Sequence, residues 1–172
     1  MKRIAILSDT HSYLDNNTIS ILNSCDEIWH AGDFGYGENI NDLITKKNLR
    51  GVYGNIDNSI IRNSFPEIYT FQSEGLKIIM AHICGSFQKY NIKIKKLIKS
   101  FRPDILVCGH SHILRVEYDK INKLLFINPG AAGKEGFHLK RTLLILHLNN
   151  NKIDKIELIN LGNRAELSQS IT

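Results

Sequence analysis

The chain has 172 residues, 42% of them hydrophobic and 23% charged, which favours one globular domain with a real core. No apolar run approaches the roughly 18 residues of a membrane span, and residues 4–7 are too short for a signal-peptide core. We therefore expect a cytoplasmic protein without a membrane partner, while the net charge of +5 leaves a phosphate-rich or nucleic-acid partner open.

The first third of the chain alternates between short apolar strands and helices. The apolar pattern predicts strands at 3–7, 27–30 and 49–53 and helices at 16–23 and 38–47. Asp15 or Asn16 is the expected N-cap of the first helix. A strand–helix–strand–helix–strand order is typical of a parallel sheet.

The rest of the chain is richer in hairpins. Residues 64–71 are expected to form a loop or a strand. Further strands are predicted at 76–81, 104–108, 113–118, 123–127, 142–148 and 152–159. We predict an α/β fold with two packed sheets flanked by helices, an αββα sandwich. Residues 1–160 should form its single domain and 161–172 a polar C-terminal tail.

A basic amphipathic helix is predicted within residues 89–102. Its apolar residues recur at helical spacing, and its outer face carries Lys89, Lys93, Lys95, Lys96, Lys99 and Arg102. A solvated helix face is the favoured interpretation, because exposed helix faces are commonly charged. A nucleic-acid partner is the alternative.

The three cysteines suggest thiols rather than disulfides. Cys25, Cys84 and Cys108 are an odd number and show no Cys-x-x-Cys spacing. This pattern fits a reducing compartment, and we interpret Cys84 and Cys108 as small buried core residues.

Five short polar motifs each end or follow a predicted strand. They are Asp9-Thr10-His11, Gly32-Asp33, Gly54-Asn55-Ile56-Asp57, Ala81-His82 and Gly109-His110-Ser111-His112. The carboxyl ends of strands in open α/β folds converge on one crevice, so these residues can meet there. Carboxylate, imidazole and amide oxygen ligands suit divalent first-row metals. Seven such ligands exceed the needs of one tetrahedral ion and predict a two-metal centre.

The spacing within the motifs supports this interpretation. Asp9 and His11 are two residues apart, so an extended backbone would point both to one side, whereas Ser111 would point away from its neighbouring histidines. Glycine before a ligand permits a tight turn and a close backbone approach. Asp57 is expected either to orient a ligand histidine from behind or to lie solvated in a loop.

The ordered set of motifs resembles the calcineurin-like metallophosphoesterase superfamily, and within it the compact bacterial and archaeal phosphodiesterase branch. The likeness runs from about Lys2 to about Leu158, and the turn Asn128-Pro129-Gly130 also matches. The resemblance implies that a first ion is held by Asp9, His11, Asp33 and His112. A second ion would be held by Asp33, Asn55, His82 and His110, so that Asp33 bridges the two.

The resemblance also implies an activity, namely hydrolysis of phosphodiesters, with phosphomonoesters as an alternative substrate, by a metal-bridging hydroxide. Asp33, Asn55 and His82 would then act through the metal-bound hydroxide and the phosphate. Two dications, two carboxylates and one hydroxide leave a charge of about +1, which should attract a small-molecule phosphate ester. Manganese is the expected metal, with iron, zinc and nickel as alternatives.

One position departs from the wider superfamily. Many members carry a histidine where this chain has Ile56, and that histidine assists the leaving oxygen. Without it, leaving-group protonation should be weak, or should come from water or another side chain. His138 is a candidate for that role, with a surface histidine as the alternative interpretation.

Two other functions compete with hydrolysis. A retromer subunit resembles this family in fold yet serves as a scaffold with an impaired metal site. All seven ligand positions are filled here, which favours an enzyme. A nuclease is the third reading, motivated by the basic helix. The oligomeric state stays open.

Overall fold

The first apolar run forms β1 (Lys2–Leu7) in the middle of a five-stranded sheet of the computed structural model, which describes residues 1–165. The sheet order is β12-β11-β1-β2-β3. Its other strands are β2 (Glu27–His30), β3 (Leu49–Gly51), β11 (Lys140–Asn149) and β12 (Lys152–Asn163). β1, β2 and β3 run parallel, which confirms the expected parallel opening.

The register of these parallel strands makes them end together. Leu7 of β1 lies opposite His30 of β2, and His30 lies opposite Gly51 of β3. The loops that leave the three strands therefore start from the same end of the sheet, at the carboxyl ends of its strands, where ligands bind in open α/β folds.

A second five-stranded sheet has the order β4-β5-β8-β10-β9. Its strands are β4 (Ile68–Ser73), β5 (Leu76–Ala81), β8 (Ile105–Val107), β9 (Arg115–Asp119) and β10 (Leu124–Asn128). β5, β8 and β10 are parallel in the centre, and antiparallel β4 and β9 form the edges. A small hairpin of β6 (Gly85–Ser86) and β7 (Lys89–Tyr90) follows β5.

The helices are α1 (Asn16–Asn23), α2 (Glu38–Ile44), α3 (Ser59–Ser64) and α4 (Ile92–Phe101). Asp15 caps α1 as expected, because its carboxylate accepts from the backbone N–H of Thr18. The basic helix α4 begins later than predicted, since Tyr90 pairs in the hairpin and Asn91 supplies the N-cap. α3 is not anticipated by the sequence pattern.

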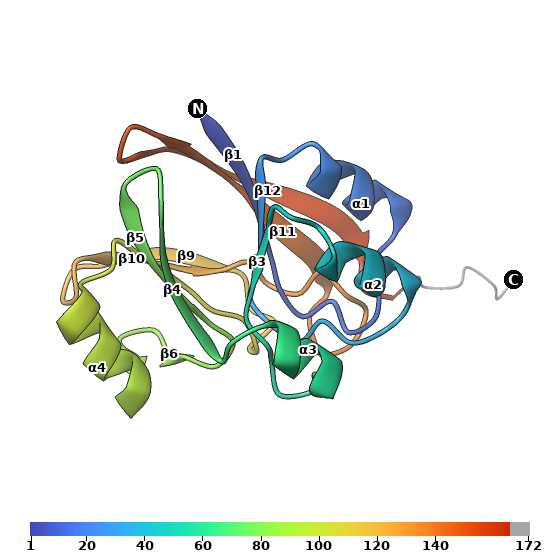
Figure 1. The fold of residues 1–172 in the computed structure, drawn as a ribbon, viewed down its shortest axis with the longest axis horizontal. Helices are drawn as coiled ribbons and strands as arrows, with labels where there is room; N and C mark the ends of the chain where they lie inside the picture. The colour runs from blue at the N-terminus through green and yellow to red at the C-terminus, as the bar shows by residue number, and fades with distance from the viewer. Residues whose placement is uncertain (166–172) are drawn as a thin grey trace, which may run out of the picture.

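The layers form the predicted αββα sandwich (Figure 1). Apolar side chains from both sheets, such as Ile6, Trp29, Met80 and Val107, make the core between them. A second cluster packs α1 and α2 on the outer face of the first sheet, and a third packs α4 on the outer face of the second. Each sheet is thus buried on both faces, which explains its nearly continuous apolar strands.

The predicted start of a polar tail at residue 161 is wrong. β12 continues through Asn163, and Leu161 is buried against the helices of the first sheet. One buried leucine between polar neighbours is enough to extend a strand that alternates between two faces. The rest of the predicted tail, residues 166–172, lies outside the described residues. Within residues 1–165, none of the helices is both long and apolar enough for a membrane span.

The buried carboxylate of Glu27 stabilises the end of the first sheet that lies opposite the motif-bearing loops. Glu27 accepts from Lys2 Nζ at 2.6 Å and from Trp29 Nε1 at 2.9 Å, and Arg50 contacts it at 3.4 Å. Burial opposes its charge, but these donors outweigh burial and hold the pKa of Glu27 below its usual value.

Glu27→Gln should therefore lower the free energy of unfolding by about 1–3 kcal/mol at pH 7, because charged hydrogen bonds are lost. The contribution of Glu27 is present above its unfolded pKa of about 4.3 and disappears as pH falls through its lower folded pKa. Urea unfolding at pH 7 and pH 3.5 should thus show the two proteins converging at low pH. The exposed Glu74→Gln serves as the control; an equal loss at both pH values would contradict the prediction.

Candidate metal centre

The strand ends of both sheets bring the predicted ligands together in two groups. The first group is Asp9, His11 and His112, and the second group is Asp33, His82 and His110. Within each group the potential ligand atoms all lie within 4.8 Å of one another. Each group combines residues from loops of the first sheet with residues from loops of the second.

Asp33 lies between the two groups. Its Oδ2 atom is 3.2 Å from His82 Nε2 in the second group and 3.5 Å from His11 Nε2 in the first. His112 Nε2 approaches Asp9 Oδ1 at 3.2 Å. One carboxylate within reach of both groups is the arrangement that a bridging ligand requires.

The atoms at the centre are acceptors without donors. Asp9 Oδ1 and His11 Nε2 are buried and have no hydrogen-bond partner among residues 1–165. Buried polar atoms are costly unless they are paired, and facing acceptors repel unless a proton or a cation lies between them. Carboxylates and imidazoles with this orientation therefore fit divalent cations.

The remaining oxygen of each carboxylate is fixed by backbone. Asp9 Oδ2 accepts from the N–H of His110 at 3.1 Å, and Asp33 Oδ1 accepts from the N–H of Ile56 at 3.1 Å. Each contact joins two motifs that are far apart in sequence. Each carboxylate thereby has one oxygen held by the protein and one directed to the centre.

His82 has a defined tautomer. Its Nδ1 lies 2.8 Å from the carbonyl oxygen of Ala31, which can only accept, so Nδ1 carries the proton. Nε2 is left as an acceptor and lies 3.1 Å from Oδ1 of Asn55. A histidine whose other ring nitrogen donates to a carbonyl is the usual form of a metal ligand.

Protons compete for the same positions in the polypeptide alone. The carboxylate of Asp9, whose Oδ1 lies 3.2 Å from His112 Nε2, raises the pKa of His112 above its usual value. Burial opposes the charge on His82, but the carboxylates of Asp33 and Asp9 outweigh burial and also raise its pKa. Cation binding would displace these protons.

The ligand-bearing loops do not have the extended backbone expected between Asp9 and His11. Five of the seven predicted ligands have positive φ, between 44° and 67°: Asp9, His11, Asp33, His110 and His112. Non-glycine residues rarely adopt this region, and such strain clusters at functional sites. One-sided projection from an extended backbone is therefore wrong, although Asp9 and His11 do lie in one group.

Two of the glycines that precede a predicted ligand are required because other residues approach their backbone closely. A Cβ on Gly54 would collide with the carboxylate and backbone of Asp33, and a Cβ on Gly109 would collide with Ser8 Oγ and approach His82. The absent side chain of Gly54 lets two loops of the first sheet approach closely, and that of Gly109 does the same for loops of the two different sheets.

Asp57 has a role that neither sequence interpretation gave. It is 4% exposed, and Oδ2 accepts from the N–H groups of Asp33 at 3.0 Å and Gly54 at 2.8 Å. Oδ1 accepts from the N–H of Gly35 at 3.0 Å. The carboxylate thus connects the Asp33 loop to the Asn55 loop and holds backbone, not a histidine.

Arg62 of α3 is a residue that the sequence analysis missed. Its Nε donates to the carbonyl oxygen of Asp57 at 2.7 Å, and Nη2 donates to those of Gly54 and Asn55 at 3.0 and 3.1 Å. The guanidinium therefore fixes the turn that carries Asn55. Arg62 was missed because α3, the short helix that carries it after the Asn55 motif, was not predicted from the sequence.

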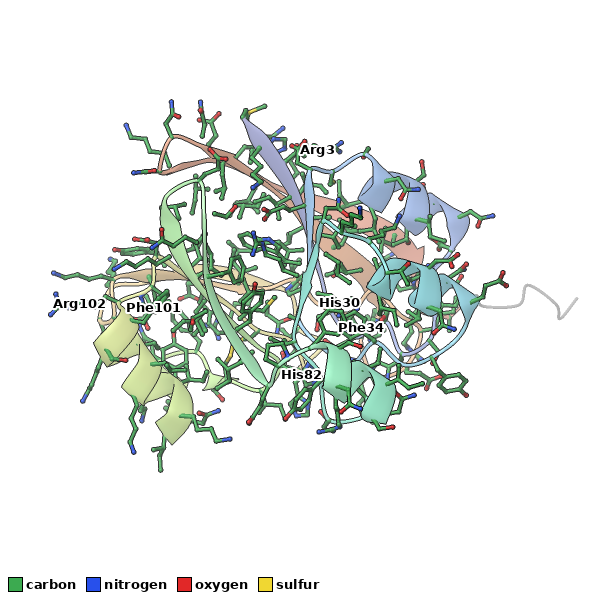
Figure 2. All side chains as sticks on the ribbon, in the orientation of Figure 1. Arg3, His30, Phe34, His82, Phe101 and Arg102 are labelled. Carbon is green, nitrogen blue, oxygen red and sulfur yellow. A yellow bond between two sulfur atoms is a disulfide. The ribbon has the colours of Figure 1, made fainter. Side chains whose placement is uncertain are left out.

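His30, labelled beside Phe34 in Figure 2, connects the Asp9 loop with the Asp33 loop. Complete burial lowers its pKa to about 3, so the ring is neutral. Nδ1 accepts from Gly32 N–H at 3.2 Å, and Nε2 therefore donates to Thr10 Oγ1 at 3.0 Å. His30 therefore has a structural role, because it braces the Asp9 and Asp33 loops.

Other singled-out residues lie at the rim. Ile56 is 46% exposed and lines a cavity with His11 and Tyr36. His138 packs its ring 5.3 Å from that of His112, and its Nε2 lies 3.1 Å from the Gly133 carbonyl oxygen. Ser111 Oγ accepts from Asn128 and from a backbone N–H, in keeping with a structural role.

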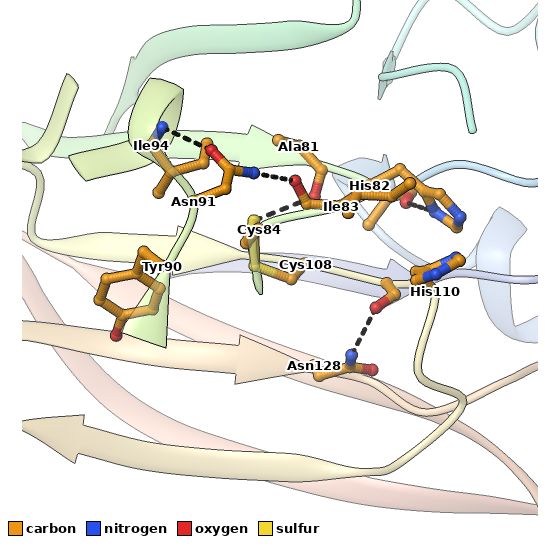
Figure 3. The surroundings of a disulfide bond; sticks show 12 residues. Ala81, His82, Ile83, Cys84, Tyr90, Asn91, Ile94, Cys108, His110 and Asn128 are labelled. Atoms are coloured by element: carbon orange, nitrogen blue, oxygen red, sulfur yellow. Dashed lines mark hydrogen bonds between the residues drawn. A yellow bond between two sulfur atoms is a disulfide. The ribbon is translucent and has the colours of Figure 1, made fainter. Parts of the chain in front are cut away.

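The predicted thiols of Cys84 and Cys108 are instead a disulfide (Figure 3). Cys84 follows His82 by two residues, and Cys108 precedes His110 by two. The bond therefore ties together the loops that carry both histidines of the second group. Cys25 is a free buried thiol, as expected. Sequence spacing gave no signal for the pair, because adjacent strands β5 and β8 bring the residues together only in the fold.

A two-sheet sandwich with helices on both sides and two such ligand groups at one edge defines a protein of the metallophosphoesterase class. The chain belongs to the calcineurin-like phosphoesterase superfamily, whose domain model matches residues 1–151. Membership of this family implies divalent metal ions.

Known proteins agree with this assignment. A relative named "Probable metallophosphoesterase" from Mycoplasma pneumoniae is 32% identical over 142 residues, which cover 76% of this chain and 79% of that relative. The structure of an archaeal phosphodiesterase superposes with a TM-score of 0.71 at 23% identity, covering 92% of this chain and 99% of the other. Zinc-bound Vps29 from Entamoeba histolytica gives 0.69 at 15% identity, covering 95% and 99%. These two structures share the fold.

Asp57→Asn should weaken metal binding by about 10–100-fold, because the amide places an NH₂ group against at least one of three backbone N–H groups. The exposed Asp42→Asn on α2 is the matched control. Competition with a fluorescent chelator would measure the affinity for Mn²⁺. Equal affinities of the Asp57 and Asp42 variants would contradict a positioning role for Asp57.

The disulfide predicts one titratable thiol in the unreduced, denatured protein, that of Cys25. Replacing Cys84 and Cys108 together with alanine should reduce the free energy of unfolding by up to about 3 kcal/mol, because a closed loop is opened in the unfolded chain. Cys25→Ala controls for the loss of a buried sulfur. Three reactive thiols, or stability unaffected by reduction, would show that the bond is absent.

Proposed function

We propose that this protein hydrolyses phosphoesters with two divalent metal ions, and diesters in preference to monoesters. The observation that carries the proposal is the pair of ligand groups within reach of Asp33, in a chain of a phosphoesterase superfamily. We assign the first ion to Asp9, His11, Asp33 and His112, and the second to Asp33, Asn55, His82 and His110.

The chain itself holds the candidate metal ligands rigidly. When bound, two dications lower the pKa of water for attack on phosphorus and neutralise charge on the phosphate oxygens. The protein contributes fixed positions: backbone N–H groups hold Asp9 and Asp33, and Ala31 holds His82. His110 and Asn55 are exposed and form the side of the site open to substrate.

Leaving-group assistance is the weak part of this site. Ile56 is at the rim and can neither donate nor accept a proton. A positioned general acid typically contributes 10²–10⁴-fold, so esters with good leaving groups should react fastest.

The metal and the location belong to the same proposal. Mixed nitrogen and oxygen ligands suit manganese, iron, zinc and nickel, and we expect manganese. We propose a cytoplasmic protein, although the Cys84–Cys108 disulfide is uncommon in reducing compartments.

Two alternatives are weaker. A scaffold on the same fold would not need two complete groups of potential ligands, and both groups are complete here. A nuclease would need a free basic face of α4 next to the site, yet Lys93, which lines a cavity with His82, is paired with Glu67, and the other end of the helix at Phe101 and Arg102 lies far from His82 (Figure 2).

Metal-stripped protein re-supplied with Mn²⁺, Ni²⁺, Zn²⁺ or Mg²⁺ should recover hydrolysis of bis(p-nitrophenyl) phosphate, and more slowly that of p-nitrophenyl phosphate. Asp33→Ala should reduce the recovered rate by at least about 100-fold, since loss of a ligand exceeds the effect of its supporting residues.

Asp42→Ala, on the exposed face of α2, is the matched control and should keep full activity. Circular dichroism would verify folding of both variants. Absence of activity with every metal in folded protein would move the assignment to the scaffold, and activity that survives in Asp33→Ala would exclude this site as its source.

A further inference from the structure

Two cavities open beside the second ligand group and meet at Ile83, the residue after His82. The Phe87 cavity, of about 360 Å³, reaches His110. The Tyr53 cavity, of about 300 Å³, reaches Asn55 and His82. Both volumes are in the range of small-molecule sites, and both adjoin the place where a phosphate would be held.

The Phe87 cavity has mainly apolar and aromatic walls. Ile83, Phe87, Ile113 and Phe126 line it, and its lining contains no carboxylate. Arg115 is its one cationic side chain, and its charge is already engaged, because the guanidinium lies 4.3 Å from the Phe87 ring centroid and pairs with Glu117 at 2.7 Å. Such walls favour a flat apolar group over a second charge.

The Tyr53 cavity differs in chemistry. Its lining includes Arg62, Glu67, Asn91 and Lys93, so charged and amide groups face the space. Lys93 and Glu67 form an exposed ion pair at 2.8 Å at this position. A hydrophilic substituent suits this side of the site.

We propose that the site selects phosphoesters that carry an aromatic or heteroaromatic ring, with the ring in the Phe87 cavity and any second, hydrophilic substituent in the Tyr53 cavity. Phe87 and Ile113 are then specificity-determining residues. The inference rests on the proposed function only in placing the phosphate at the two ligand groups. A diester occupies both cavities, whereas a monoester leaves one empty.

Unreactive phosphonates test the cavity without turnover. Phenylphosphonate and methylphosphonate carry the same anionic group and differ in the ring alone. Calorimetric titration of manganese-loaded protein should show phenylphosphonate binding about tenfold or more tightly, because burial of the additional ring carbons is favourable. Binding is independent of the leaving group and of the rate of hydrolysis.

Variants of the cavity lining should change the ratio between the phenylphosphonate and methylphosphonate affinities and little else. Phe87→Ala removes the stacking surface, and Ser86→Trp fills the cavity from an exposed lining position. Both should bring the two affinities to within about twofold while methylphosphonate affinity stays. Ile113→Ala, at a residue 66% exposed, tests the opposite wall with little risk to folding. Tyr118→Ala, an exposed aromatic on β9 outside the cavity lining, is the control.

The outcomes separate this inference from its premise. Ester hydrolysis combined with equal phosphonate affinities, or a ratio unchanged in Phe87→Ala and Ser86→Trp, overturns the aromatic cavity alone. A ring preference that disappears in these variants supports the cavity even if no ester is hydrolysed. Failure of both phosphonates to bind overturns the cavity together with the phosphate site.

Discussion

The acceptor atoms that face one another around Asp33 Oδ2 are the constraint to which the rest of the site conforms. His11 Nε2 and His82 Nε2 lie 3.5 and 3.2 Å from this oxygen, and they come from different sheets. Such a cluster is unfavourable without a cation or protons, so the surrounding backbone has to hold it in place. The N–H contacts to both carboxylates and the contacts of Asp57 and His30 supply that restraint.

Those contacts explain why strained backbone persists in the ligand loops. Five ligand residues have positive φ, at a cost of order 1–3 kcal/mol each. Hydrogen bonds between loops, and glycines that allow those loops to touch, offset this cost locally. The geometry is thus a property of several loops together, and no single motif determines it.

The sequence could predict features that a single motif determines, but it could not predict features that depend on contacts between several loops. Strand positions and the candidate ligand positions follow from apolar runs and from polar residues directly after them, as at His30–Asp33 and Ala81–His82. Asp57 and the Cys84–Cys108 bond act on partners that strand order brings together, and Arg62 acts from the short helix α3, which the apolar pattern did not predict. The tail boundary failed for a related reason, because one buried residue, Leu161, decides it.

Because each ligand group draws on loops of both sheets, a bound ion would also act as a clip between the layers. Separation of the sheets would require release of both ions, so metal binding is linked to the docking of the two halves of the sandwich. Chelation should therefore increase transient opening along the whole seam, where proteases could reach β5 and β8. In this arrangement the contacts that would bind the ions would also hold the two sheets together.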